Sequence, residues 1–255
     1  MKAHLLTDIH NEHRTAPYRV ADINFDVLVL AGDIDSGLDG ITWAAGESQR
    51  LGVPVIYVAG NHEYYGTELL SHEMAMRELA ASVGVHYLNN DAVVINGVRF
   101  MGTTLWTDYQ LTGDDPFFVH YQIKRAMSDH RLIRYGDRLF STEQAFELHQ
   151  QSISWLEKSL QSNTSYQANV VVSHHGPSEL CVHPAWKKHI VTNAYCSNLE
   201  HLVEQSNCWF YGHTHAALDT KVGKARLVSN PAGYPDQETG FEPKLVIDIL
   251  RGECE

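Results

Sequence analysis

The sequence predicts an α/β sandwich, because short apolar runs alternate with longer amphipathic segments along the chain. Several of the short runs are continuously apolar, which is typical of strands buried on both faces. We expect strands at residues 2–7, 27–31, 53–59, 92–95, 99–102, 169–173, 208–211, 225–229 and 244–249. No linker, repeat or low-complexity tract divides the 255 residues, so we expect one domain over residues 1–255.

Helices are predicted between these strands by apolar residues at helical spacing. Residues 38–51 and 68–83 show this pattern, and residues 142–160 show it after a capping residue, Ser141. Residues 191–205 carry a weaker version of it. The sequence therefore places a helix between most pairs of strands, as layered α/β folds require.

Two further segments qualify this picture. The dipeptide Asn96-Gly97 lies between two predicted strands and predicts a hairpin turn, so part of the sheet is antiparallel. Residues 108–140 contain aromatic and charged side chains without a clear strand pattern. Long insertions of this kind often cover active sites. We expect an active-site cover there, and the alternative is a solvated helical excursion.

Composition narrows the function. The chain has 19 basic and 31 acidic residues and a formal net charge of −12, which disfavours binding to nucleic acid. No apolar stretch reaches the length of a membrane span, and the N-terminus lacks the apolar core of a signal peptide, so we expect a cytoplasmic protein. The four cysteines (Cys181, Cys196, Cys208 and Cys254) lack metal-binding spacing, and we expect reduced thiols.

Five short motifs, each directly after a predicted strand, carry side chains that bind metals. They are Asp8-Ile9-His10, Gly32-Asp33, Gly60-Asn61-His62-Glu63, His174-His175 and Gly212-His213-Thr214-His215. Each motif alone is a common turn sequence. Together they fall where α/β sheets bind ligands, at the carboxyl ends of strands. The set offers enough donors for two divalent ions, and Asp, Asn and His side chains suit Mn²⁺, Fe²⁺, Co²⁺, Ni²⁺ or Zn²⁺.

Spacing indicates how individual donors reach a metal. Asp8 and His10 are two residues apart, so on an extended segment their side chains point the same way. The carboxylate of Asp33 has two oxygens and is able to bridge two cations. Gly32 before it allows the backbone to approach the metals closely.

In this order the motifs D-x-H, G-D, G-N-H-E, H-H-G-P and G-H-T-H resemble those of the calcineurin-like metallophosphoesterase superfamily, and they span residues 8–215. The resemblance implies a four-layer α/β/β/α sandwich of two mixed sheets flanked by helices, with a dinuclear metal site at one sheet edge. It implies one ion bound by Asp8, His10, Asp33 and His215. It implies a second ion bound by Asp33, Asn61, His174 and His213, with Asp33 bridging the two.

The resemblance also implies a mechanism, in which a hydroxide shared by two metals attacks phosphorus. His62, next to the ligand Asn61, would protonate the leaving group or hydrogen-bond the phosphoryl oxygens. His175 would either orient His174 or contact the phosphate. Tyr64 and Tyr65 would line the part of the site that binds a nucleotide or other organic group of the substrate, although core packing explains them equally well. Residues 230–234 form either a rim loop or a simple Asn-Pro turn.

The sequence says less about the substrate than about the metal site. Protein phosphatases of the superfamily carry GDxxDRG, whereas this chain has Gly32-Asp33-Ile34-Asp35-Ser36-Gly37, without the phosphate-gripping arginine and with Asp35 one residue closer. Repair nucleases usually add basic surface, which is absent here. We therefore expect a phosphodiesterase acting on a small-molecule or nucleotide substrate. The alternatives are a phosphomonoesterase, a protein phosphatase, or a non-catalytic scaffold, which the intact ligand positions and His62 disfavour.

Overall fold

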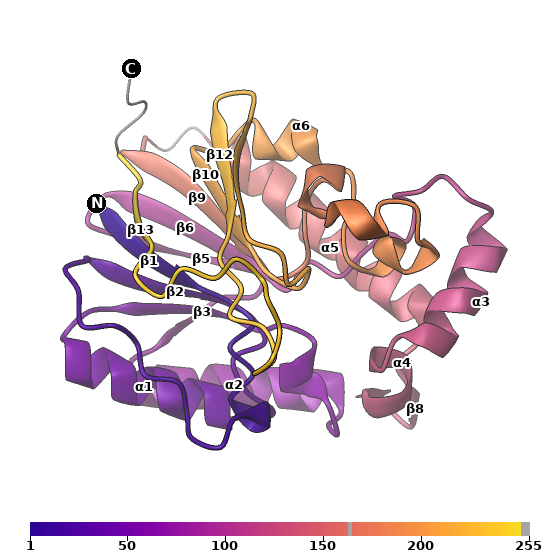
Figure 1. The fold of residues 1–255 in the computed structure, drawn as a ribbon, viewed down its shortest axis with the longest axis horizontal. Helices are drawn as coiled ribbons and strands as arrows, with labels where there is room; N and C mark the ends of the chain where they lie inside the picture. The colour runs from indigo at the N-terminus through magenta and orange to yellow at the C-terminus, as the bar shows by residue number, and fades with distance from the viewer. Residues whose placement is uncertain (163–164, 251–255) are drawn as a thin grey trace.

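Two mixed β-sheets face each other and carry helices on their outer faces in the computed structural model, which describes residues 1–162 and 165–250 (Figure 1). Across the first sheet the order is β13 (Val246–Asp248), β1 (Lys2–Leu6), β2 (Val27–Ala31), β3 (Val55–Val58) and β4 (His86–Tyr87). Strands β1 to β4 are parallel, and β13 pairs with β1 in the antiparallel sense. The carboxyl ends of β1, β2 and β3 therefore meet at one edge.

The second sheet repeats this arrangement with antiparallel strands at both edges. Its order is β11 (Leu218–Val222), β12 (Ala225–Ser229), β10 (Cys208–Tyr211), β9 (Ala168–Ser173), β6 (Val98–Thr103) and β5 (Asp91–Ile95). The four inner strands are parallel. Strands β5 and β6 form the predicted hairpin around Asn96-Gly97, where both residues have positive φ. The expectation of mixed sheets is confirmed.

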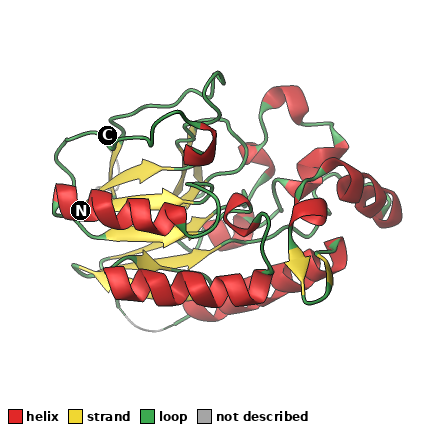
Figure 2. Cartoon of the chain, turned by 90° about the horizontal axis from the view of Figure 1, so that it is seen from below, coloured by secondary structure: helices red, strands yellow, loops and turns green. Residues whose placement is uncertain are grey.

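Helices complete four layers, as the resemblance implies. Helices α1 (Asp39–Leu51) and α2 (Leu69–Val83) cover the first sheet, and α5 (Thr142–Leu160) and α6 (Glu200–Val203) cover the second. The helices lie along the outside of the strands when the molecule is seen from below (Figure 2). The predicted cap of α5 is present, since Ser141 and Gln144 form a reciprocal capping box.

Alternation along the strands decides which side chains form which layer of the core. In β2, Val27, Val29 and Ala31 face the second sheet, and Leu28 and Leu30 face the helices. All five are fully buried, as the continuous apolar run predicts. The wholly buried strands thus fix the sheet edge from which the polar loops emerge.

One helix prediction is wrong. Residues 191–205 form a short 3₁₀ helix, Ile190–Ala194, followed by an extended stretch and then α6. The extended stretch bonds to the chain after β9, with Ser197 N–H donating to Gly176 O (3.0 Å) and Leu199 N–H donating to Pro177 O (2.8 Å). This tertiary pairing outweighs the weak helical pattern. The short strands β4 and β11 were also not predicted from the sequence.

The insertion at residues 108–140 contains more regular structure than its sequence indicates. It forms α3 (Pro116–Ala126), the single turn α4 (Asp129–Leu132) and a hairpin of β7 (Arg134–Tyr135) and β8 (Arg138–Leu139). Cys181, Cys196 and Cys208 are buried free thiols, and Cys254 lies outside the described residues. Within residues 1–162 and 165–250, no helix combines the length and apolarity needed to cross a bilayer.

Candidate metal centre

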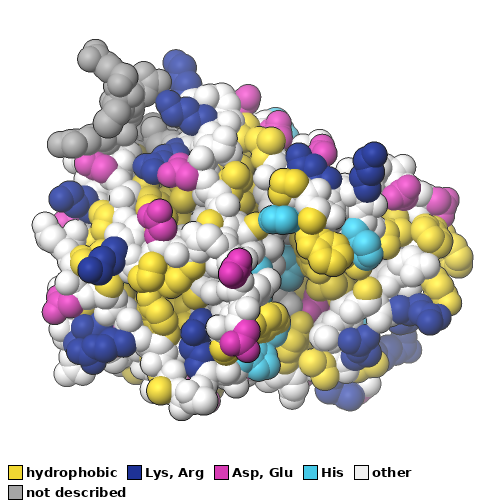
Figure 3. All heavy atoms as spheres, viewed as in Figure 1, with side chains coloured by type: hydrophobic (Ala, Val, Ile, Leu, Met, Phe, Trp, Pro, Cys, Tyr) yellow, Lys and Arg dark blue, Asp and Glu magenta, His cyan; other side chains and the backbone are white. Residues whose placement is uncertain are grey.

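The five predicted motifs converge at the carboxyl edge of the two sheets. Backbone hydrogen bonds join their loops: Asp8 N–H donates to Gly32 O (3.0 Å), His10 N–H to Asp33 O (3.0 Å), and Gly212 N–H to His174 O (2.9 Å). A pocket of about 610 Å³ opens over them. Figure 3 shows histidine side chains grouped around a hollow in the middle of this face. The topology thus brings together residues more than 200 positions apart.

Most of the predicted ligands adopt a left-handed backbone conformation, which is uncommon outside glycine. The φ angles lie between 48° and 68° for Asp8, His10, Asp33, His213 and His215. The extended geometry that we used to relate Asp8 to His10 is therefore wrong, because β1 ends at Leu6 and both ligands follow in tight turns. Strained backbone of this kind persists where surrounding structure holds it, often at functional sites.

One group of donors lies beneath the loops of β1 and β10. His10 Nε2 lies 3.1 Å from His215 Nε2, and Asp8 Oδ1 lies 3.4 Å from His215 Nε2. The far ring nitrogens are both used: His10 Nδ1 donates to Glu12 Oε1 (2.9 Å), and His215 Nδ1 donates to Gln237 Oε1 (2.6 Å). When both rings are neutral and their Nδ1 atoms donate in this way, the lone pairs of the two Nε2 atoms point at each other. That contact is repulsive unless a cation lies between them.

A second group surrounds His174. Its Nδ1 donates to the Ala31 carbonyl (2.9 Å), so in the neutral ring Nε2 is an acceptor. That nitrogen faces three more polar atoms: Asn61 Oδ1 (3.1 Å), His213 Nδ1 (3.1 Å) and Asp33 Oδ2 (3.4 Å). No hydrogen bond at His213 Nε2 fixes the tautomer of that ring; with the proton on Nε2, four acceptors converge here and fit a divalent cation.

Asp33 links the two groups. Its Oδ2 lies 3.8 Å from His10 Nε2 and 3.4 Å from His174 Nε2, and its Oδ1 accepts the His62 N–H (2.9 Å). Burial by itself would raise the pKa of Asp33, but the neighbouring His174 and His62 rings hold it well below its usual range. The carboxylate is therefore ionised and available to both groups.

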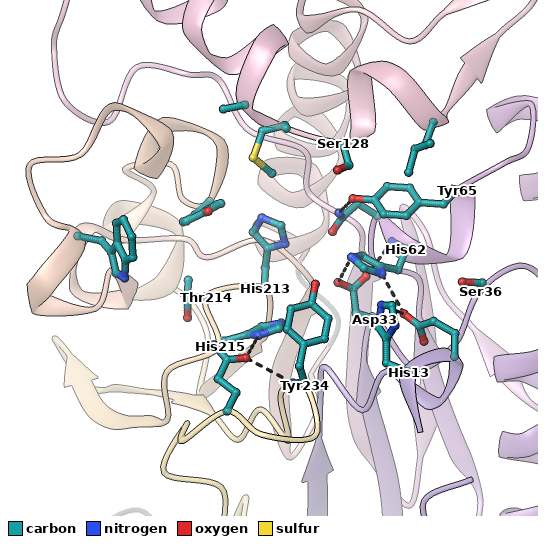
Figure 4. Close-up of a pocket in the computed structure, with 18 of the residues that line it drawn as sticks. His13, Asp33, Ser36, His62, Tyr65, Ser128, His213, Thr214, His215 and Tyr234 are labelled. Atoms are coloured by element: carbon teal, nitrogen blue, oxygen red, sulfur yellow. Dashed lines mark hydrogen bonds and ion pairs between the residues drawn. The ribbon is translucent and has the colours of Figure 1, made fainter. Parts of the chain in front are cut away.

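His62 lies beside these groups with its ring directed into the pocket (Figure 4). Its Nδ1 donates to Glu12 Oε1 (2.9 Å), Nε2 lies 3.9 Å from Asp33 Oδ2, and its ring packs on Tyr65 with centroids 4.4 Å apart. Burial lowers the pKa of His62, but the carboxylates of Asp33 and Glu12 outweigh it and raise the pKa to about 9. The arrangement holds a proton on this ring.

Two glutamates that the sequence reading did not assign support the site. Glu12 accepts hydrogen bonds from both His10 and His62. Glu63, fully buried, accepts the N–H groups of Asp33 (3.1 Å), Ile34 (2.9 Å) and Gly60 (2.8 Å) and the Tyr57 hydroxyl (2.8 Å). Its place in the G-N-H-E motif was the available signal for Glu63. For Glu12 the sequence offered none beyond proximity to His10.

Of the three candidate substrate-contacting residues, one lines the pocket and two are buried away from it. Tyr65 lines the pocket. Tyr64 is buried in the core, where its hydroxyl donates to Glu73 (2.6 Å), so the packing alternative describes it. His175 is also buried: its Nδ1 donates to Thr104 O (3.0 Å) and its ring packs behind His213 with centroids 4.3 Å apart. Neither Tyr64 nor His175 is among the described residues that line the pocket.

The loop after β12 reaches the pocket, as the rim-loop reading of residues 230–234 expects. Tyr234 lines it together with Gln237. The Tyr234 ring lies 4.5 Å from the His10 ring and 4.9 Å from the His215 ring, centroid to centroid. This aromatic side chain therefore forms the side of the pocket next to the first group of donors (Figure 4).

Comparison with known proteins agrees with this geometry. A family model described as calcineurin-like phosphoesterase matches residues 1–217. An uncharacterized protein of Acanthamoeba polyphaga mimivirus is 22 % identical over 241 residues, covering 87 % of this chain and 83 % of the viral protein.

Two solved structures share the fold. Phosphopantetheinyl hydrolase from Mycobacterium tuberculosis superposes with a TM-score of 0.70 and 18 % identity, covering 92 % of this chain and 90 % of its own. The Thermus thermophilus protein TT1561 gives a TM-score of 0.53 and 11 % identity, covering 90 % and 88 %. At these identities the likeness concerns the fold alone.

Proposed function

This chain belongs to the calcineurin-like phosphoesterase family, and from that premise we propose that it is a dinuclear metal-dependent phosphodiesterase acting on a small-molecule or nucleotide substrate. The observation that carries the proposal is that two clusters of metal-binding side chains lie on either side of Asp33 Oδ2, which is close to both. When their histidine rings are neutral, the atoms of each group present lone pairs to one point, so each group fits one divalent cation.

The residues for each ion follow from the two groups. Asp8, His10, Asp33 and His215 would hold one ion, and Asp33, Asn61, His174 and His213 the other, with Mn²⁺, Fe²⁺, Co²⁺, Ni²⁺ or Zn²⁺ as candidates. Such a pair of ions lowers the pKa of a water nucleophile and neutralises phosphoryl oxygens. The three remaining tasks fall to the protein: to orient the donors, to orient the ester, and to protonate the leaving group.

His62 would perform the proton transfer. Its Nδ1–H bond to Glu12 fixes the ring so that Nε2 faces Asp33 and the pocket. Nε2–H would then donate to the ester oxygen as it leaves, and general acid assistance of this kind is worth about 10²–10⁴ in rate. Tyr65, packed on the ring, keeps it in this orientation.

Charge in the pocket favours a diester. Among the described residues that line it there is no Lys or Arg, and the carboxylate of Glu12 is present. A phosphomonoester is a dianion after loss of both protons, whereas a diester carries one negative charge, and fewer cations are needed to bind it. The missing arginine of the G-D motif agrees with this preference.

The insertion would serve as the cover. Ala126, Met127, Ser128 and Leu132 from this segment line the pocket. Ser128 lies across it from Tyr234 of the rim loop (Figure 4). Substrate would therefore pass between the insertion and the rim loop to reach His62.

A metal and substrate screen tests the function. The purified protein, stripped and reloaded with Mn²⁺, is assayed on bis-4-nitrophenyl phosphate, 4-nitrophenyl phosphate, cyclic nucleotides, phosphopeptides and, given the activity named for the Mycobacterium tuberculosis neighbour, a phosphopantetheinyl ester. We expect two bound ions and a preference for diesters. Preferred turnover of a monoester or phosphopeptide would reject the diester assignment, and no bound metal with no turnover would favour a scaffold.

A further inference from the structure

One wall of the pocket has no part in the proposed chemistry. Most of its side chains, from the insertion and from the segment between β9 and α6, are apolar or aromatic, and Ser128 and His183 are the polar exceptions. We call the apolar members the apolar wall: Ala126, Met127, Leu132, Val182, Trp186 and Tyr195. Trp186 is 51 % exposed and Leu132 is 46 % exposed. Large apolar side chains left exposed around a pocket indicate a surface that a ligand covers.

Charge restricts what the apolar wall accepts. No Lys or Arg occurs among the described residues lining the pocket, and the protonated ring of His62 lies beside Asp33 and not in the apolar wall. Lys187 and Lys188 directly follow Trp186, but they are exposed and do not line it. A group that carried a second phosphate or a carboxylate against this wall would lose hydration without gaining an ion pair. An uncharged apolar group would lose only unfavourable contact with water.

We propose that the apolar wall binds an uncharged, hydrophobic group esterified to the scissile phosphate, so that the preferred substrate is a phosphodiester with one apolar arm. This inference rests on the proposed phosphodiesterase function. The phosphate would lie over Asp33, and the arm would extend between Met127 and Trp186, which come from different segments of the chain.

Single-armed phosphonates test the proposal without turnover. Methyl esters of methylphosphonate and benzylphosphonate, named below by the phosphonate alone, carry one negative charge as a diester does. They present the same anion to the Mn²⁺-loaded protein and differ only in the arm, and isothermal titration calorimetry gives both affinities. We expect benzylphosphonate to bind about tenfold more tightly, the gain typical of one well-placed aromatic contact. We also expect 4-carboxybenzylphosphonate to lose that gain, because its carboxylate finds no Lys or Arg in the apolar wall.

Variants identify the wall. Trp186→Ala and Met127→Ala should each reduce the benzyl preference to less than about threefold while leaving methylphosphonate affinity unchanged. Leu180→Ala is the matched control, since Leu180 is 44 % exposed nearby and does not line the pocket. Equal affinities for the two phosphonates, or a preference that survives in Trp186→Ala, would overturn the proposal. Failure of the proposed function is separate, because it appears as absent hydrolysis while these affinities remain measurable.

A second inference comes from an independent contact. Asp129 of the insertion is buried, with 3 % exposure. Its Oδ1 accepts from Asn61 Nδ2 (2.9 Å) and from the Tyr65 hydroxyl (2.7 Å). A carboxylate only accepts, so this contact assigns the nitrogen of the Asn61 amide to Asp129 and turns the oxygen toward His174.

The geometry points to Asp129 as a positioning residue that fixes the Asn61 amide in its metal-binding orientation. Asn61 Nδ2 also donates to the Tyr65 hydroxyl (2.8 Å), but a hydroxyl both accepts and donates, so without Asp129 it no longer fixes which end of the amide faces the cation. Partners that orient a metal ligand in this way typically change metal affinity by about 10- to 100-fold. The insertion would thus contribute both to the pocket wall and to the metal centre.

Metal affinity provides the test. In Asp129→Ala we expect one of the two Mn²⁺ affinities to fall about 10- to 100-fold by calorimetry on the apo protein, and Asp129→Asn, which keeps an acceptor oxygen, to recover most of it. Asp137→Ala, in an exposed acid of the same insertion, should change neither. Unchanged Mn²⁺ binding in a folded Asp129→Ala protein would refute the role. If Asp129→Ala does not fold, Asp129→Leu replaces it, because leucine keeps the volume and has no acceptor: a loss of about 10- to 100-fold in Mn²⁺ affinity supports the role, and wild-type affinity refutes it.

Discussion

Replacing Glu12 by Gln should remove the carboxylate that holds and orients His62 for proton transfer, while keeping the shape of the site. Glu12 Oε1 accepts from His10 Nδ1 and His62 Nδ1, each at 2.9 Å. A hydrogen bond to a charged group contributes about 1.5–3 kcal/mol, which corresponds to roughly 10- to 150-fold per bond. We therefore expect kcat/KM for a diester with an unactivated alcohol leaving group to fall about 100-fold in Glu12→Gln.

The leaving group distinguishes proton transfer from other losses. A 4-nitrophenolate leaving group needs little protonation, so its release should fall less than about fivefold in Glu12→Gln at saturating Mn²⁺. His62→Ala should show the same contrast between substrates. Because both side chains act through one hydrogen bond, the double variant should be no slower than His62→Ala alone. Mn²⁺ titration of Glu12→Gln separates the effect on His10.

Two results would refute this reasoning. One is an equal loss on both leaving groups at saturating Mn²⁺, which would assign Glu12 to metal binding through His10 alone. The other is a double variant slower by the product of the two single losses, which would show that Glu12 and His62 act independently.

Three further predictions concern the supporting structure. Asp33→Asn removes the shared charge, so we expect bound Mn²⁺ to fall from two ions toward one or none by elemental analysis, and full occupancy would contradict the bridge. Gly60→Ala would place a methyl group against Asp33 Oδ1 and 2.7 Å from His174 Cε1; we expect metal binding to be lost with an unchanged circular dichroism spectrum, and wild-type Mn²⁺ affinity would contradict this. Burial lowers the pKa of His149, with Asp108 and the Trp106 carbonyl opposing the shift. The folded state thus binds this proton later than the unfolded state as pH falls, and stability should drop below pH ~6.5 by up to about 1.4 kcal/mol per pH unit. Urea unfolding of His149→Gln should lack this part of the slope, and identical slopes would exclude the residue.

The sequence located most of the candidate site because the chemistry of each donor is local. An apolar run followed by Asp33 or Asn61 reveals both a buried strand end and a ligand. Sequence order also indicated the family, and with it the layered fold. Helix 191–205 was predicted wrongly because its weak local pattern competes with backbone pairing to Gly176, a contact made only after β9 is in place.

The tertiary structure decided which distant side chains form hydrogen bonds with one another. Glu12 looks like an ordinary acid in sequence, and only the fold brings His62 to it across 50 positions. Asp129 lies 68 positions from Asn61, inside a segment whose sequence shows no strand pattern. The sequence by itself therefore determined the donors and the strand ends that present them, since both depend on neighbouring residues. The orientation of those donors and the apolar wall depend on contacts between segments, so only the folded chain could specify them.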